Sequence, residues 1–195
     1  MNKLLTLALG LFLLSSCEKS PVGEEPPVDN HPRMQYTDLQ NFEVKPGTFK
    51  RVDLDGNGTN DLLFKTLLVG DALGQRDRLQ FYAHTGIGIY QPVNELEEVP
   101  QLSTGEAVKV QFPGYTWYEI TAIVLAEKIT PVSGSVHWEG PWKAASHKFL
   151  PVMVEREGKA YYGWVELSFD TASEKMTLHR AAISTEAGRE VIAGR

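Results

Sequence analysis

Cysteine is almost absent from this chain of 195 residues: Cys17 is the single example, so no disulfide can form within the chain. The five histidines are scattered and show neither H-x-x-x-H nor H-E-x-x-H spacing. Zinc chemistry therefore has no support from the sequence. The G-x-S-x-G elbow, the phosphate-binding loop and the dinucleotide fingerprint are also missing, so the sequence marks no familiar catalytic or nucleotide-binding class.

The chain also lacks a run of about 20 apolar residues, the length that a membrane-spanning helix needs. It opens with Met1-Asn2-Lys3, and an apolar stretch of eleven residues follows from Leu4 to Leu14. One positive charge before a short apolar stretch is the anatomy of a secretory signal peptide, which we place at residues 1–16.

The apolar stretch ends in Leu14-Ser15-Ser16-Cys17, which resembles the lipobox of bacterial lipoproteins. The resemblance implies that the signal is cut before Cys17 and that this residue carries the lipid. It places the protein in the cell envelope, anchored to the outer membrane on its periplasmic or surface face. The alternative is an ordinary secretory signal with an incidental cysteine, but lipidation accounts for the lone thiol of an exported protein.

The segment from Glu18 to Pro32 is rich in proline and acid and has almost nothing to bury, which predicts a disordered or extended tether over 17–33. Its acidic residues resemble a surface-export signal of some bacterial phyla, and a plain acidic linker fits equally well. Without residues 1–16, the chain keeps 18 basic and 25 acidic residues, a formal charge of −7. This balance argues against nucleic acid and anionic membrane surfaces as direct partners.

Residues 34–195 suffice for one domain with a proper core. Helical periodicity is absent, and short β-rich runs alternate with Gly, Pro, Asn and Asp, which predicts a mostly β fold, an antiparallel sandwich or jelly-roll-like single domain. A short helix is considered near Val93–Glu98, but the proline and valine residues in and beside that segment disfavour it. The expected strands are Thr48–Leu54, Leu62–Val69, Leu79–His84, Ala107–Phe112, Ile120–Lys128, Lys148–Glu155, Tyr161–Asp170 and Lys175–Ala182.

Within Tyr161–Asp170, apolar residues such as Val165 and Leu167 alternate with Glu166 and Ser168, so one face of this strand is expected to be buried. Tyr162 and Trp164 fall on the other face. We favour packing under a second layer for these two aromatic residues over exposure as a binding platform. Asp170–Glu174 is expected to be the hairpin loop to the next strand.

The strongest chemical motif has the form D-x-D-x-N-G-x-x-D and begins at Asp53. Calcium takes six to eight oxygen ligands, and alternate residues of a tight loop can aim their oxygens at one point. Gly58 falls at the sixth position, where such a loop turns sharply. The expected calcium ligands are Asp53, Asp55, Asn57, Thr59 (through its carbonyl) and Asp61.

The spacing resembles EF-hand, dockerin and integrin-type calcium loops. Position twelve is Phe64 rather than the glutamate of an EF-hand, and a strand follows the loop in place of a helix. The strand–loop–strand setting is closer to the integrin type and implies an ion that stabilises the fold. The alternative is a hairpin turn whose Asp and Asn residues only favour the turn geometry.

Near the C-terminus stand Tyr162-Gly163-Trp164 and an ending with Ala187-Gly188 and Ala193-Gly194. Together with the early aspartate loop, these features resemble uncharacterised exported bacterial β proteins, including ones with a PEP-CTERM anchor. The match is partial, because the tyrosine of that ending is replaced by Ala182 or Ile183. The resemblance implies a secreted sandwich-like domain and no particular activity.

Four aromatic residues lie in Gly- and Pro-containing segments, where binding sites tend to occur. Tyr115, Trp117, Trp138 and Trp142 are therefore candidates for contact with a glycan or an envelope protein. Glu119 and Glu139 stand beside aromatic residues and are the candidate pair for a glycosidase, which needs two carboxylates at one bond. We favour a binding or structural role in the envelope over catalysis.

Overall fold

The computed structural model describes residues Asn30–Arg195, of which His31–Arg195 form a compact unit. The expected signal peptide, Cys17 and most of the expected tether lie outside the described residues. Within the described part, no helix is long and apolar enough to cross a membrane.

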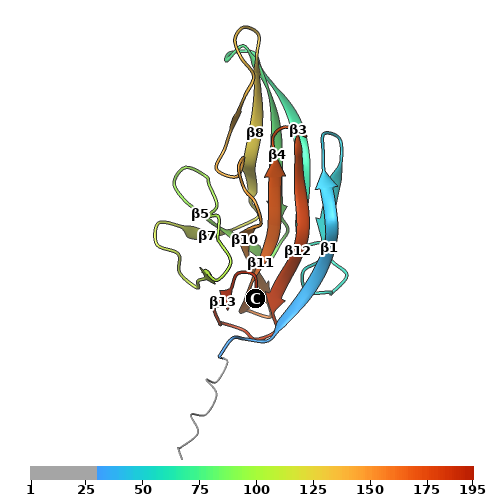
Figure 1. Ribbon diagram of the computed structural model, residues 1–195. Coiled ribbons are helices and arrows are strands. Elements are labelled where there is room, and N and C mark those ends of the chain that lie inside the picture. Colours follow the sequence, from blue (N-terminus) through green and yellow to red (C-terminus); the bar gives the residue numbers. More distant parts are fainter. Residues whose placement is uncertain (1–29) are drawn as a thin grey trace, which may run out of the picture. The chain divides into compact units, whose positions relative to one another are not determined.

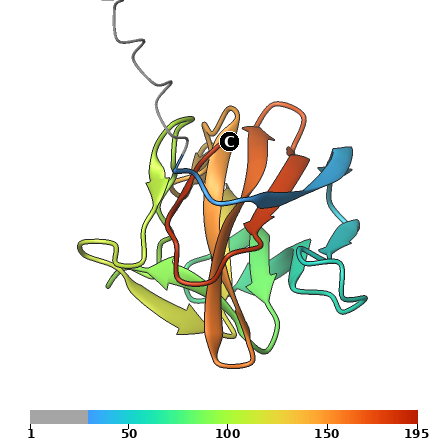
Figure 2. The ribbon, with the colours of Figure 1, turned by 90° about the horizontal axis from the view of Figure 1, so that it is seen from below.

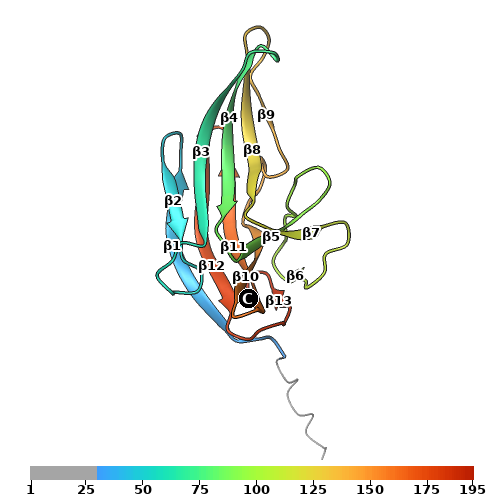
Figure 3. The ribbon, with the colours of Figure 1, turned by 180° about the vertical axis from the view of Figure 1, so that it is seen from behind.

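Two antiparallel sheets make up the body of the domain (Figure 1; Figure 3 gives the view from behind). The six-stranded sheet has the order β1 (Met34–Val44), β12 (Lys175–Ser184), β11 (Lys159–Asp170), β10 (Lys148–Arg156), β5 (Ile89–Val93) and β7 (Thr116–Glu119). The five-stranded sheet has the order β2 (Phe49–Val52), β3 (Leu62–Asp71), β4 (Arg76–Thr85), β8 (Ala122–Pro131) and β9 (His137–Glu139). A small pair joins β13 (Val191–Ile192) to β6 (Ala107–Val108).

The two large sheets bury a common central core, to which each contributes alternate side chains. Phe64, Phe81 and Leu125 come from the five-stranded sheet and are fully buried. Val165 and Leu167 on β11 face the same core from the six-stranded sheet, as their alternation with Glu166 and Ser168 predicts. The expected mostly β, sandwich-like fold is therefore confirmed.

A second apolar cluster, the outer core, covers part of the opposite face of the six-stranded sheet. It contains Trp164 and Tyr162 of β11 together with Phe149 of β10 and Val191 of β13. Trp164 and Tyr162 are thus packed under a second layer, as we favoured, and are 0% and 4% exposed. Figures 1 and 2 show the β5–β7 region standing to one side of the orange and red strands.

All eight expected strands have a counterpart, although only the first two residues of Ala107–Phe112 are extended in β6. The expected loop at Asp170–Glu174 is present, and the Asp170 carboxylate accepts the N–H groups of Ala172 and Ser173. Five strands were not predicted. They are β1, β5, β7, β9 and β13.

The short helix considered near Val93–Glu98 is absent, and a tight turn takes its place. The side-chain oxygen of Asn94 accepts the N–H groups of Leu96 and Glu98, at 3.0 and 2.8 Å. Asn94 thereby offers the backbone a local alternative to helical hydrogen bonds, which is why asparagine favours turns.

Candidate functional site

The aspartate loop connects β2 to β3, and it brings three of its five expected ligands together. Asp53, Asp55 and Asp61 each place one carboxylate oxygen within 4.8 Å of the others. Asn57 and Thr59 are exposed, and the Asn57 side-chain oxygen accepts the N–H of Thr59 at 2.6 Å.

Backbone hydrogen bonds hold these carboxylates in position. Asp53 accepts the N–H groups of Gly56 and Gly58 at 2.7 and 2.8 Å, and both glycines have positive φ angles of 72° and 86°. Such angles suit glycine, which lacks a Cβ. Asp61 accepts the N–H of Leu54 at 2.7 Å, so the two ends of the loop are tied together.

The loop concentrates negative charge where water is largely excluded. Asp61 is 4% and Asp55 9% exposed. Burial, together with the charges of Asp55 and Asp53, raises the pKa of Asp61 to about 6. The Oδ2 atom of Asp55 is buried without a hydrogen bond, and its nearest cation is Arg156 on β10, with Nη1 at 3.4 Å. A divalent cation among the three carboxylates would relieve this repulsion.

The four aromatic candidates do not form one platform. Trp142 is fully buried and donates its ring N–H to the Val99 carbonyl, so its ring offers no open surface to a ligand. Trp138 is partly buried and packs against the central core, with its ring centre 5.4 Å from that of Phe169. Trp117 packs on the outer core instead, with its ring centre 5.7 Å from that of Tyr162.

Tyr115 belongs with Trp117, because both contact Phe112, with ring centres at 6.3 and 5.8 Å. The two carboxylates considered for catalysis stand on different sheets. Glu119 on β7 accepts the N–H of Gly88, whereas Glu139 on β9 pairs with His137. Neither pairing supplies a carboxylate couple at a single bond.

A polar hollow of about 480 Å³ lies on the outer face of the six-stranded sheet, where the outer core ends. Along β11 this face changes from Tyr162 and Trp164 to Glu166 and Ser168. The hollow is lined by Tyr36, Thr37, Asp38, Asn41, His147, Glu166, His179 and Arg180.

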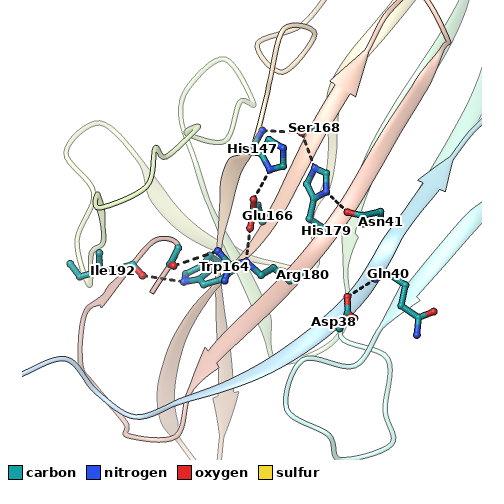
Figure 4. A network of polar contacts seen from close by, with 11 residues as sticks. Asp38, Gln40, Asn41, His147, Trp164, Glu166, Ser168, His179, Arg180 and Ile192 are labelled. Carbon is teal, nitrogen blue, oxygen red and sulfur yellow. Dashed lines mark hydrogen bonds and ion pairs between the residues drawn. The ribbon is translucent and has the colours of Figure 1, made fainter.

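A continuous network of polar contacts connects six residues at this hollow, whereas the dashed lines join Asp38 only to Gln40 (Figure 4). The six are Arg180, Glu166, His147, Ser168, His179 and Asn41. Glu166 Oε2 accepts a hydrogen bond from Arg180 Nε at 2.6 Å, and Glu166 Oε1 lies 2.7 Å from His147 Nδ1. The His179 ring lies 2.8 Å from Ser168 Oγ through Nε2 and 2.7 Å from Asn41 Oδ1 through Nδ1. The rings of His147 and His179 are stacked, with centres 4.3 Å apart.

The hydrogen bonds and charges of this network determine the protonation of Glu166 and His179. Burial raises the pKa of Glu166, but the hydrogen bonds from Arg180 and His147 outweigh it and hold this pKa below its usual value. Glu166 is therefore ionised at neutral pH and accepts the proton on His147 Nδ1. Burial and the neighbouring His147 lower the pKa of His179, which is consequently neutral.

The sequence does not reveal this hollow, because its residues come from β1, β12, β11 and the loop before β10, far apart along the chain. The Glu166 and Ser168 positions on the polar face of β11 were the only local sign of it. A larger hollow of about 650 Å³ lies at the β3–β4 turn, but there Asp71 and Arg76 pair with each other at 2.9 Å.

Comparison with known proteins gives no family: no family model, no curated protein and no solved structure matches the chain.

Proposed function

We propose that the protein is an exported lipoprotein whose β domain is stabilised by calcium and has a binding or structural role in the cell envelope. The spacing of the aspartate loop supports calcium binding, because three of the five expected ligands place carboxylate oxygens within 4.8 Å of one another. The buried Oδ2 of Asp55 accepts no hydrogen bond and has only Arg156 near it, at 3.4 Å, which supports its use as a ligand for a cation. The lipid anchor rests on the sequence around Cys17.

The calcium proposal is tested by thermal melting of the full-length protein in detergent. EDTA should lower Tm, and calcium at about 100 times its Kd should add about 2.7 kcal/mol and restore it. For a domain of this size, that corresponds to a shift of about 5–10 °C. Asp53→Asn should remove most of the difference between the two conditions.

Asp71→Asn is the matched control, because Asp71 also accepts the N–H of a turn residue, Gly74 at 2.7 Å, but stands outside the aspartate loop. This variant should keep the full response to calcium. If the melting curve of the unmodified protein ignores both EDTA and calcium, the loop is a simple turn.

The anchor is tested by expression in a lipoprotein-processing bacterium with an alkyne-tagged fatty acid. The protein should take up the label and have Cys17 as its mature first residue. Cys17→Ala should abolish labelling. Unlabelled protein with a different first residue would point to an ordinary secretory signal.

A further inference from the structure

The polar hollow is built by three departures from regular β structure. The pairing of β1 with β12 shifts between Asp38 and Phe42, and Gln40 and Asn41 there have φ angles of 59° and 51°. On β12, His179 is the extra residue of a bulge, because Arg180 pairs with Glu166 and Leu178 with Leu167. His147 has a φ of 47° just before β10.

Each of these departures positions a side chain of the same hollow, namely Asn41, His179 and His147. Backbone angles of this kind in residues other than glycine cost about 1–3 kcal/mol each. Bulges commonly re-aim a side chain at a binding site. Two irregularities of strand pairing and one left-handed residue before β10 thus direct their side chains to the same hollow.

The side chains are fixed before any ligand arrives. The Asn41 oxygen is held by His179, and the Ser168 hydroxyl oxygen accepts the backbone N–H of His147 at 2.9 Å. Asp38 accepts the N–H of Gln40 at 2.8 Å. An amide, a carboxylate and a guanidinium that are held in this way present fixed donors and acceptors to a ligand, and their fixed geometry lowers the entropy lost on binding.

The charges of the hollow are nearly balanced. Arg180 and Glu166 neutralise each other, with Arg180 Nε 2.6 Å from Glu166 Oε2, and His179 is neutral. Asp38 is left as the only unpaired ion among the lining residues, so an anionic ligand meets net repulsion. The hollow therefore disfavours an anion, and its amide, carboxylate and guanidinium groups fit a ligand that is rich in hydrogen-bonding groups.

The wall of the hollow next to β1 is aromatic. Tyr36 is 54% exposed, and its ring stands edge-on to Trp164, with centres 6.3 Å apart. The Arg180 guanidinium lies 5.3 Å from the centre of the same Trp164 ring, so Tyr36 and Arg180 both pack against Trp164. An exposed tyrosine ring offers a flat apolar surface with a polar edge, which suits a ligand that has both C–H faces and hydroxyl groups.

We propose that this hollow binds a neutral saccharide, with one sugar face on Tyr36 and its hydroxyl groups toward Asn41, Asp38 and Arg180. A volume of about 480 Å³ is within the range of small-ligand sites. This site lies apart from the aspartate loop and from the aromatic segments around Trp117 and Trp138. It involves neither calcium nor lipid, so its test is independent of the function proposed above.

The test is saturation-transfer NMR and calorimetry on the full-length protein in a detergent without sugar headgroups. The probes are glucose, galactose, mannose, xylose, N-acetylglucosamine, maltose, lactose and cellobiose, with glucosamine and glucuronate as charged comparisons. At least one neutral sugar should bind. Tyr36→Ala should weaken its Kd about tenfold, which is about 1.4 kcal/mol. Asn41→Gly, which keeps the positive φ without strain, should weaken it as well.

Tyr118→Ala is the matched control, because Tyr118 is also 54% exposed but lies on β7 at the other edge of the sheet. This variant should keep the Kd of the unmodified protein, and thermal melting should show all three variants folded. Three results would overturn the proposal: no binding of any neutral sugar, binding of a charged comparison alone, or a Tyr118→Ala loss as large as that of Tyr36→Ala.

Discussion

Glu166 is a buried carboxylate on the open face of a sheet, held by one guanidinium and one imidazole. Its pKa lies below the usual value, which means that the folded protein favours the ionised form more than the unfolded chain does. The stabilisation is therefore complete above the unfolded pKa, near 4.5, and is lost as the pH falls through the lower folded pKa.

Glu166→Gln should remove this dependence. We expect the variant to be less stable at pH 7 by about 1–2 kcal/mol, because it loses charge-assisted hydrogen bonds to Arg180 and His147. Urea melts at pH 7, 5 and 3 should show the gap between variant and unmodified protein closing toward pH 3.

Glu95→Gln is the comparison for this measurement, because Glu95 is an exposed residue of the Asn94 turn. Its melts should follow those of the unmodified protein at every pH. If Glu166→Gln lowers the free energy of unfolding by the same amount at every pH, the charge of Glu166 does not contribute to stability.

The two candidate sites differ in how well single residues predict them. Asp53, Asp55 and Asp61 lie within nine residues, so spacing alone indicates that their oxygens meet. Asn41, His147 and His179 meet only through strand pairing and bulges, which leave no spacing pattern. Trp142 shows the limit of composition, because a tryptophan in a Gly- and Pro-containing segment turned out to be fully buried.

At the scale of single elements, β11 and β12 approach each other unusually closely at Gly163. A Cβ at this position would lie 2.2 Å from the Ala182 carbonyl oxygen and 2.9 Å from the Ile183 Cα. The close neighbour is the backbone of β12, which has little freedom to move.

Gly163→Ala should therefore destabilise the domain by at least about 2 kcal/mol, since the strands must separate to admit a methyl group. For a domain of this size, Tm should fall by about 4–8 °C. Gly70→Ala is the matched control within β3, where the nearest atom to an added Cβ is Asp77 Oδ1 at 3.7 Å.

The control should change Tm little or raise it slightly, because alanine restricts the unfolded chain. Equal Tm values for Gly163→Ala and the unmodified protein would mean that β11 and β12 separate more easily than their contacts indicate.

The elements that sequence analysis found and missed differ in length and pattern. β3, β10 and β11 are long strands with apolar residues at regular positions, and they were predicted. β13 and β9 are only two and three residues long, too short to show a period. β1 is long, but the irregular stretch between Asp38 and Phe42 interrupts its alternation, and Leu39 is its only fully buried residue before Val44.

At the scale of the whole molecule, the aspartate loop connects the two sheets. The loop joins β2 to β3 in one sheet, and Arg156 at the end of β10 reaches Asp55 from the other, at 3.4 Å. Arg156 is itself held over the Tyr161 ring at 3.9 Å. An ion bound in the loop would therefore stabilise both sheets together.

Hydrogen exchange measured by mass spectrometry can test this coupling. Calcium should slow amide exchange in β10 and β11 as well as in residues 53–61, because Asp55, an expected calcium ligand, also contacts Arg156 of β10. The β3–β4 turn, which lies away from the loop, should respond least. Slower exchange confined to 53–61 would mean that calcium orders only its own loop.

The pairing of β1 with β12 has a consequence for the time course of folding. Met34 pairs with Ser184, so the first strand of the domain to be made finds its partner only when nearly the whole chain exists. Pairings between residues so distant in sequence form slowly. Until β12 pairs with β1, the backbone donors and acceptors along that edge of β1 are unpaired and can bind to other chains. A newly made copy therefore passes through a period in which a holding chaperone would protect it from pairing with a neighbour.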